Sequence, residues 1–505
     1  MERLTEAPPR ARRRAGLSRG VLCVAFVGAF HLATIRAGQD WGDDFSMYIH
    51  HAENLARGIP YAETGYIYNL HNPVVGPRTY PPGFPLLLAP IVRLFGRALW
   101  PMQVLVVLSL AGSLLLLLHL FRGVLPSPHL EVLVLLTGLN PVVWDAKDHV
   151  LADLPFLCLV LSSFAWFAQA SAADAPGRRR MISGLLAGLF AYAAYATRVL
   201  GVVLVPTFLA HDLIRRRRVG APAMAACAVF VLLAAAQYFV WLGDRSYLDQ
   251  LTVTPALLER NALDYARSLS DLWTNGYSDV ARKAFFLASS GLAALGYANA
   301  LRVGMREAGW PDVFPWLYLA PVIAWPSFQG IRFLIPVIPF YLLYCLRGTR
   351  DLDETVARRW GRKHLVLAGL SAAAAVTYAA QYSRVQFGGF PTGVARPENV
   401  AFFDFVKTAT DSNAVFVFSK PRALALYTGR KASAPFDPAD PCLLWRYFAE
   451  IGASYVVTGP DQPEFDVAYL HRFVDQYPDD LRPLWRNGEV AVYRIERNPC
   501  APTLP

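Results

Sequence analysis

The chain has 505 residues, of which 54% are hydrophobic and only 17% charged, and its mean hydropathy is positive. A single soluble globule would not carry repeated apolar runs near the bilayer-spanning length of about 20 residues, so the composition predicts a polytopic α-helical membrane protein. The formal net charge of +10 does not indicate nucleic-acid binding, because the basic residues cluster between apolar runs, where membrane topology places them.

The first apolar run, residues 21–37, follows an arginine-rich segment, residues 1–20. No small-residue cleavage site separates this run from the acidic residues beyond it, so we expect an uncleaved first helix with a cytoplasmic N-terminus. Ten further apolar runs bring the prediction to about eleven transmembrane helices. These runs are residues 99–121, 130–144, 154–170, 181–196, 199–214, 221–243, 284–304, 313–326, 331–346 and 365–382.

The apolar run 84–95 is short and has Pro82, Pro85 and Pro90 at or near its start. If it spanned the membrane, the later basic clusters, such as residues 178–180 and 215–218, would lie outside the cell. The positive-inside rule therefore favours an interfacial or re-entrant helix. With that topology the loops 38–98, 145–153 and 244–283 lie on the outer side, together with everything after the last helix.

The tail, residues 385–505, differs in character from the membrane domain, residues 21–384. Strand-like runs at 414–418, 455–457 and 490–495 alternate with helical runs at 422–427 and 443–451, which predicts a small external α/β domain. Cys442 and Cys500 are the cysteines of this tail. A disulfide between them is open at this stage, because the sequence gives no distance between the two thiols.

Two adjacent carboxylates, Asp43 and Asp44, follow the first apolar run, with Tyr48 four residues after Asp44. They stand at the start of a helical pattern, so one reading is that they cap that helix. Capping explains one aspartate but not obviously both. The other reading is a general base, since a carboxylate at a partly dehydrated membrane surface can take a proton from an attacking hydroxyl.

This acidic pair with Tyr48, followed by Tyr80-Pro81-Pro82-Gly83, resembles the type C glycosyltransferases of the protein O-mannosyltransferase and lipid A aminoarabinose transferase group. The resemblance implies transfer of a sugar from a polyprenyl monophosphate to an acceptor hydroxyl at the outer face, usually with inversion. It also implies a catalytic acidic residue in the first external loop. The spacing to Tyr48 favours Asp44 for that role and leaves Asp43 in reserve.

Asp153, just before Leu154-Pro155-Phe156, resembles the second acidic position of these enzymes. It is a candidate for binding the acceptor or, with Asp44, a divalent cation; the alternative is an ordinary helix cap. Arg198 and Arg332 fall on the outer side, against the positive-inside trend. A lipid phosphate would account for them, because guanidinium groups bind phosphate in a bidentate manner, and snorkelling arginines are the alternative.

Candidate substrate contacts in the first loop are Tyr48, Tyr80 and His71. The histidines of this loop match no strong zinc pattern, and no nucleotide-binding motif occurs, so no cofactor is predicted beyond a divalent metal. We therefore expect a bacterial inner-membrane glycosyltransferase whose partners are a polyprenyl-phosphate-linked sugar, the bilayer, and a glycan, lipid or protein acceptor. The alternative is a lipid-linked sugar transporter or flippase, in which intramembrane charges line a path.

Overall fold

The computed structural model describes residues 10–172, 175–240, 253–302, 309–459 and 468–500. The chain divides into two compact units. The helical unit comprises Met1–Ile35, Gln103–Val240 and Val253–Gly388, and the mixed unit comprises Arg36–Met102, Trp241–Thr252 and Gly389–Pro505. The predicted first external loop, residues 38–98, thus shares a compact unit with the tail, whereas the sequence analysis grouped it with the membrane domain.

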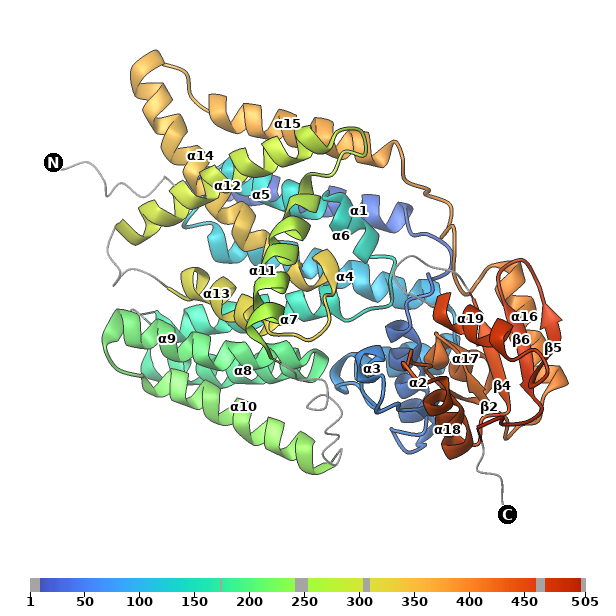
Figure 1. The fold of residues 1–505 in the computed structure, drawn as a ribbon. Coiled ribbons are helices and arrows are strands. Elements are labelled where there is room, and N and C mark those ends of the chain that lie inside the picture. Colours follow the sequence, from blue (N-terminus) through green and yellow to red (C-terminus); the bar gives the residue numbers. More distant parts are fainter. Residues whose placement is uncertain (1–9, 173–174, 241–252, 303–308, 460–467, 501–505) are drawn as a thin grey trace. The chain divides into compact units, whose positions relative to one another are not determined.

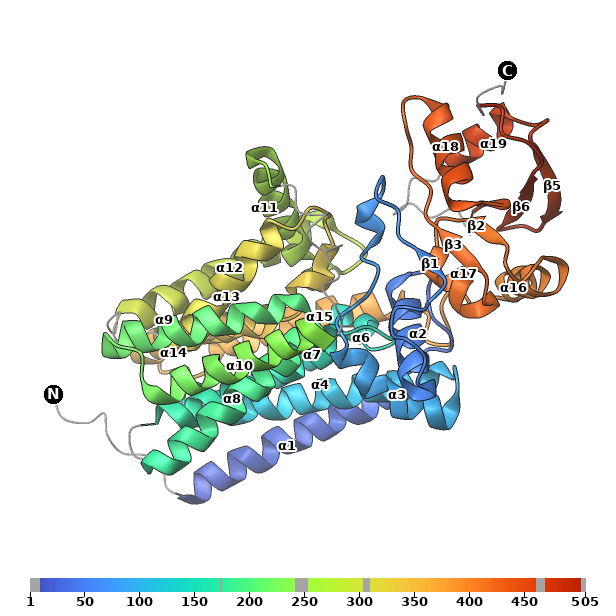
Figure 2. The ribbon, with the colours of Figure 1, turned by 90° about the horizontal axis from the view of Figure 1, so that it is seen from below.

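The helical unit consists of helices whose long members run side by side in Figure 2. Helix α8 packs against α7 and α10, and α12 packs against α14. The helices are α1 (Arg10–Ala33), α4 (Leu99–Phe121, beginning in the mixed unit), α5 (His129–Gly138), α6 (Pro141–Ala146), α7 (Asp153–Ser171), α8 (Gly177–Thr197), α9 (Leu204–Arg216), α10 (Ala221–Val240), α11 (Pro255–Ser270), α12 (Asp279–Arg302), α13 (Trp310–Ile323), α14 (Ile338–Trp360) and α15 (Leu365–Tyr382). Short 3₁₀ segments are η2 (Val199–Val203), η3 (Asp271–Trp273) and η5 (Gly330–Leu334).

Among the described residues, five helices are long and apolar enough to cross a membrane: α4, α7, α10, α12 and α15. Their length and composition support the predicted integral membrane protein. The number of about eleven spans stays a prediction, and residues 1–9, 241–243 and 303–304 of the predicted N-terminus and spans lie outside the described residues. So do residues 244–252, with which the third predicted loop begins, and residues 460–467 and 501–505 of the predicted tail.

Three predicted spans are interrupted. The run 199–214 begins as the 3₁₀ segment η2, and α9 starts only at Leu204. The run 130–144 is split into α5 and α6, because the Asn140 side chain accepts a hydrogen bond from the Val142 N–H at 2.9 Å and Pro141 occupies the first position of the new helix. The run 331–346 begins as the 3₁₀ segment η5, and α14 starts only at Ile338 with Pro339 in its first turn. The continuous helices predicted there were wrong, because capping residues and prolines end a helix within an apolar run.

The mixed unit contains a six-stranded sheet with the order β1-β3-β2-β4-β6-β5. Strands β1, β3, β2 and β4 are parallel, and β6 and β5 are antiparallel to their neighbours. Its helices and strands are α2 (Asp44–Arg57), β1 (Tyr66–Ile67), the 3₁₀ segment η1 (Pro73–Val75), α3 (Gly83–Phe95), α16 (Pro397–Ala409), β2 (Val415–Val417), α17 (Pro421–Thr428), β3 (Lys431–Ser433), α18 (Pro441–Ile451), β4 (Tyr455–Thr458), α19 (Ala468–Gln476), β5 (Leu481–Arg486) and β6 (Ala491–Ile495).

The sheet is covered on both faces, which is why its central strands are apolar throughout. Val417 points into a core made with α18 and α19, including Trp445 and Phe473. Phe418 points the other way, toward Phe402 of α16. Each strand and helix predicted in the tail is present. The unexpected member is β1, which comes from the first loop and pairs with β3.

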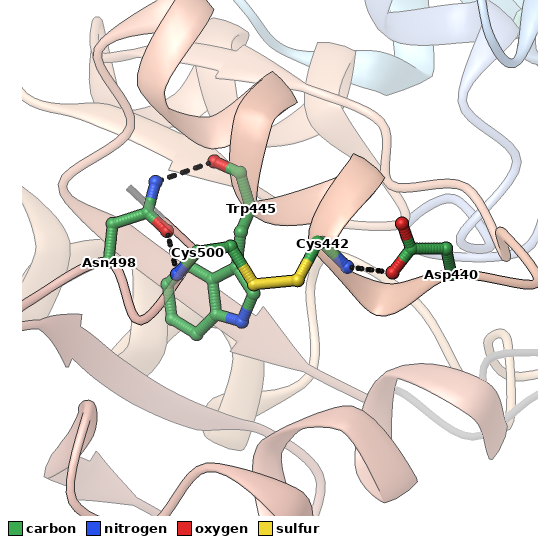
Figure 3. The surroundings of a disulfide bond; sticks show 5 residues. All are labelled: Asp440, Cys442, Trp445, Asn498 and Cys500. Carbon is green, nitrogen blue, oxygen red and sulfur yellow. Dashed lines mark hydrogen bonds between the residues drawn. A yellow bond between two sulfur atoms is a disulfide. The ribbon is translucent and has the colours of Figure 1, made fainter. Parts of the chain in front are cut away.

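The disulfide between Cys442 and Cys500 is formed, with the two Cα atoms 5.4 Å apart (Figure 3). It joins the start of α18 to the end of the described chain. Asp440 caps α18 by accepting a hydrogen bond from the Cys442 N–H, and the Asn498 side chain donates to the Trp445 carbonyl. Disulfides persist mainly in oxidising compartments. The external location of this tail stays a prediction.

Candidate active site

A cluster of opposite charges lies at the start of α2, in the mixed unit. We call it the acid–arginine cluster; its members are Asp43, Asp44, Tyr80 and Arg422. The carboxylates and Tyr80 come from the first predicted loop, and Arg422 comes from α17 in the tail. The structure therefore brings together two residues of the acidic motif and an arginine almost 380 positions later.

Asp43 caps helix α17 of the tail and not α2, the helix that it precedes. It occupies the residue before α2, but within the described chain its side chain makes no capping hydrogen bond to that helix. Instead its carboxylate accepts hydrogen bonds from the N–H groups of Ala423, at 3.0 Å, and Arg422, at 3.4 Å. These donors lie in the first turn of α17, so Asp43 satisfies a helix N-terminus. Burial raises the pKa of the Asp43 carboxyl, while the cations of Arg422 and Lys420 oppose that shift.

Asp44 keeps more of its carboxylate in contact with solvent than Asp43 does: 25% of the side chain is exposed, against 9%. Its Oδ1 accepts a hydrogen bond from the Tyr80 hydroxyl at 2.5 Å and one from Arg422 Nη1 at 3.3 Å. Both donors stabilise the ionised form of a carboxylate. Asp44 is thus an oriented, partly accessible carboxylate, which is what a general base requires.

Arg422 is buried, with only 1% of its side chain exposed. Besides Asp44, its Nη1 donates to the Tyr80 hydroxyl at 2.6 Å, and its guanidinium lies over the rings of Tyr66 and Tyr80. Burial alone would lower the pKa of Arg422, but the neighbouring tyrosines and aspartates raise it overall, so the side chain stays a cation. Gly76 makes room for it, because a Cβ there would lie 2.0 Å from Arg422 Nη2.

The predicted substrate contacts in the first loop differ in their surroundings. Tyr48 is buried, with its ring against Tyr80 and Phe84 at centroid distances of 4.9 and 5.0 Å, so it supports the cluster through packing. Tyr80 belongs to the cluster itself. His71 is exposed and stacks on Phe436 at 4.7 Å. Of the three, Tyr80 therefore belongs to the cluster and His71 to the surface, whereas Tyr48 is buried.

One histidine that sequence reasoning left without a role positions Tyr80. The His51 ring donates from Nδ1 to the Tyr61 carbonyl at 2.8 Å and accepts the Tyr80 N–H on Nε2 at 3.2 Å. Since a carbonyl only accepts and an amide N–H only donates, these partners fix the neutral tautomer with its proton on Nδ1. A lone histidine in a helical pattern gives no signal of this role in sequence.

A second group of predicted residues meets in the helical unit, and we call it the Asp153 triad: Asp153, Arg198 and Arg332. Asp153 begins α7, Arg198 follows the end of α8, and Arg332 lies in η5. Arg198 Nη1 donates to one carboxylate oxygen of Asp153, and Arg332 Nε donates to the other at 3.1 Å. Asp153 is 3% exposed, and the Arg332 side chain is 28% exposed.

The Asp153 triad carries one more positive charge than negative charge. Asp153 holds both guanidinium groups in place, and the more exposed Arg332 offers donors for an anion such as a phosphate. A divalent cation fits Asp153 poorly, because a guanidinium already binds each of its carboxylate oxygens. Asp44 and Asp153, which the sequence analysis linked through a metal, belong to different units.

Sequence reasoning missed a buried ion pair between two adjacent residues of the second predicted external loop. Lys147 is fully buried and donates to Asp148 at 2.6 Å and to the Thr34 carbonyl at 2.8 Å. Its ammonium also lies over the Trp144 ring. The pair therefore fixes α6 to the end of α1, and a short polar stretch between apolar runs gives no indication of that burial.

No protein-family model and no curated protein matches the chain. Solved structures do match it. ArnT from Cupriavidus metallidurans bound to undecaprenyl phosphate is 12% identical, with a TM-score of 0.58 over 94% of this chain and 97% of ArnT. The oligosaccharyltransferase AglB from Archaeoglobus fulgidus, in complex with an inhibitory peptide and a dolichol-phosphate, is 11% identical, with a TM-score of 0.58 over 92% of this chain and 72% of AglB.

These similarities establish a shared fold. The predicted resemblance to the lipid A aminoarabinose transferase group is confirmed at that level, and the polytopic helical class is confirmed with it.

Proposed function

We propose that the protein is a membrane glycosyltransferase that moves a sugar from a polyprenyl-monophosphate donor to an acceptor hydroxyl. The observation that carries this proposal is the partly exposed Asp44 carboxylate, held by Tyr80 and Arg422 in a chain that shares the ArnT fold. ArnT was solved with undecaprenyl phosphate bound, which supports a lipid-linked donor for the same fold. We place the reaction at the outer face of a bacterial inner membrane.

Asp44 acts as the general base. It takes the proton of the acceptor hydroxyl while the hydroxyl oxygen attacks the anomeric carbon of the donor sugar from the side opposite the phosphate. The bond between the anomeric carbon and the phosphate oxygen breaks, and its electron pair leaves with the polyprenyl phosphate. The product is a glycoside with inverted configuration.

Arg332 and Arg198 bind the departing phosphate. Negative charge grows on the phosphate as the glycosidic bond breaks, and guanidinium donors held by Asp153 stabilise that charge without reorganising. Asp153 is a positioning residue in this mechanism. Arg332 is the better candidate for direct contact because it is the more exposed of the two arginines.

The test is sugar transfer by purified full-length protein in liposomes, supplied with a panel of radiolabelled polyprenyl-monophosphate sugars. Wild type is compared with Asp44→Asn, and the matched control is Asp43→Asn, which changes the neighbouring carboxylate in the same way. Each protein is assayed with and without a chelator, which tests whether transfer needs a divalent metal.

We expect wild type and Asp43→Asn to transfer one of the sugars, and Asp44→Asn to be slower by about 10²–10⁴-fold, the usual contribution of a general base. Near-normal turnover by Asp44→Asn would refute the assignment of the base. Failure of wild type with every donor, together with flux of the labelled lipid across the bilayer, would refute transfer and favour the flippase.

A further inference from the structure

A second cluster of titratable side chains lies in the helical unit, apart from the residues used above. Its members are His129, the first residue of α5, Asp353 near the end of α14, and His364, which precedes α15. The three helices pack against one another, and Figure 1 shows α14 turning back into α15. One ligand atom from each residue lies within 4.8 Å of the other two.

His129 is the informative member because it is buried without being satisfied. Its side chain is 1% exposed, and neither ring nitrogen has a hydrogen-bond partner among the residues that the structure describes. A buried polar group in that condition costs about 1–3 kcal/mol. His129 Nε2 faces Asp353 Oδ2 at 3.9 Å, which is too long for a hydrogen bond but leaves space for an ion between the two atoms.

Asp353 and His364 are arranged as ligands rather than as a simple ion pair. The Asp353 carboxylate accepts hydrogen bonds from the N–H groups of Val366, at 2.7 Å, and Leu367, at 3.2 Å, which fix its orientation. Such outer-shell hydrogen bonds are typical of metal-binding carboxylates. The His364 ring lies edge-on to His129, with centroids 5.6 Å apart, and it is exposed to solvent.

From this geometry we propose that His129, Asp353 and His364 form a binding site for a zinc-like divalent transition-metal ion. Two imidazoles and a carboxylate suit Zn²⁺ better than Mg²⁺ or Ca²⁺, which prefer oxygen ligands. Ligand atoms about 2.0–2.2 Å from a tetrahedral ion lie about 3.4 Å apart, so the three side chains need to move by only about 1 Å. Solvent at His364 supplies the fourth ligand, a water.

The site would join the ends of three helices on the side of the membrane that the positive-inside rule assigns to the cytoplasm. It is independent of the proposed transferase reaction, because none of its residues belongs to the acid–arginine cluster or the Asp153 triad. Its test therefore reads out metal content, not activity.

The experiment uses full-length protein with an affinity tag that contains no histidine, stripped with EDTA in detergent and then incubated with a small excess of ZnSO₄. Bound zinc is measured after gel filtration by mass spectrometry, and affinity by competition with a chromophoric chelator. The variants are His364→Asn, which keeps a residue that tolerates the positive φ of 61°, and Asp353→Asn. The matched control is His119→Asn, another exposed histidine at the end of a helix.

We expect about one zinc per chain in wild type and in His119→Asn, and at least a tenfold loss of affinity in His364→Asn and Asp353→Asn, because loss of even an outer-shell partner costs about 10–100-fold. Substitution of Co²⁺ should give the visible absorption of a tetrahedral site in wild type and in His119→Asn, but not in His364→Asn or Asp353→Asn. Equal zinc binding by wild type and His364→Asn, or no binding by wild type, would overturn the proposal. His364 is exposed, so its variant tests the site even if buried His129 cannot be replaced without unfolding.

Discussion

Replacing Arg422 by methionine removes a buried cation from between two carboxylates. The guanidinium lies 3.7 Å from Asp43 and 3.3 Å from Asp44, distances at which each attraction is worth about 4–5 kcal/mol at an effective dielectric constant of about 20. Two effects offset part of this lost attraction. Methionine removes the cost of burying a charged arginine, and Asp44 is partly exposed to solvent. We therefore expect a net loss of about 3–5 kcal/mol, the usual cost of removing one partner from a buried ion pair.

The loss of stability should appear as a lower Tm of the mixed unit. We would measure this Tm by the tryptophan fluorescence of the purified protein during heating. A cost of 3–5 kcal/mol corresponds to a decrease in Tm of roughly 10 °C for a unit of this size. Trp41 and Trp445 are buried in this unit and report its unfolding. Arg422→Lys is the control, since it keeps the charge but not the planar fork, and it should recover a large part of the stability.

The same variant should alter the pH dependence of transfer. With the cation gone, a proton competes better for Asp44, so the acidic limb of the pH–rate profile moves to higher pH in Arg422→Met and returns in Arg422→Lys. A purely structural role for Arg422 would lower the amount of folded protein without moving that limb. An unchanged Tm and an unchanged profile in Arg422→Met would refute the reasoning.

Three further predictions concern the mixed unit. Both Asp43→Ala and Asp43→Asn lose the attraction to Arg422, and Asp43→Ala should destabilise the unit by about 0.5–2 kcal/mol more through loss of the α17 cap, because Asp43→Asn keeps an acceptor oxygen; equal Tm values for the two would contradict the cap. Gly76→Ala should mimic Arg422→Met in thermal unfolding, because the new Cβ would lie 2.0 Å from Arg422 Nη2; an unchanged Tm would show that Arg422 can move away. Burial lowers the pKa of His50 from 6.5 to about 4. Between these pH values the unfolded state binds more protons than the folded state. The free energy of unfolding should therefore fall, by at most about 3 kcal/mol, as the pH drops from 6.5 to about 4. Unfolding of His50→Gln should depend less on pH there; the same pH dependence as wild type would exclude His50 as its source.

The sequence predicted elements well where one local signal decided the structure. In the tail, the predicted helical run 443–451 and strand-like run 490–495 are present as α18 and β6, and Gly452 ends α18 with a positive φ of 65°. It failed where a local interruption competed with an apolar run, as at Asn140 and Pro141. It also missed β1, because two residues that pair with a strand far along the chain have no pattern of their own.

The acidic pair shows why the site was only half predictable. From sequence, Asp43 and Asp44 presented a choice between a helix cap and a general base. In the structure Asp43 does cap a helix, but that helix is α17, about 380 residues away, and not the one that Asp43 precedes. A local pattern specifies that a carboxylate is available near a helix start; it does not specify which donors reach it.

The hydrogen bonds that Asp43 accepts bear on which aspartate is the general base. A carboxylate whose oxygens accept backbone N–H groups cannot take up a proton from a substrate without giving up the cap, so Asp43 is poorly suited to cycle between protonation states. The Asp44 carboxylate accepts hydrogen bonds from a tyrosine hydroxyl and a guanidinium, neither of which belongs to a helix cap, and 25% of its side chain is exposed. The hydrogen bonds between Asp43 and helix α17 of the tail, which the sequence motif does not reveal, therefore distinguish the roles of the two aspartates. The paired variants Asp43→Asn and Asp44→Asn measure this difference in role directly.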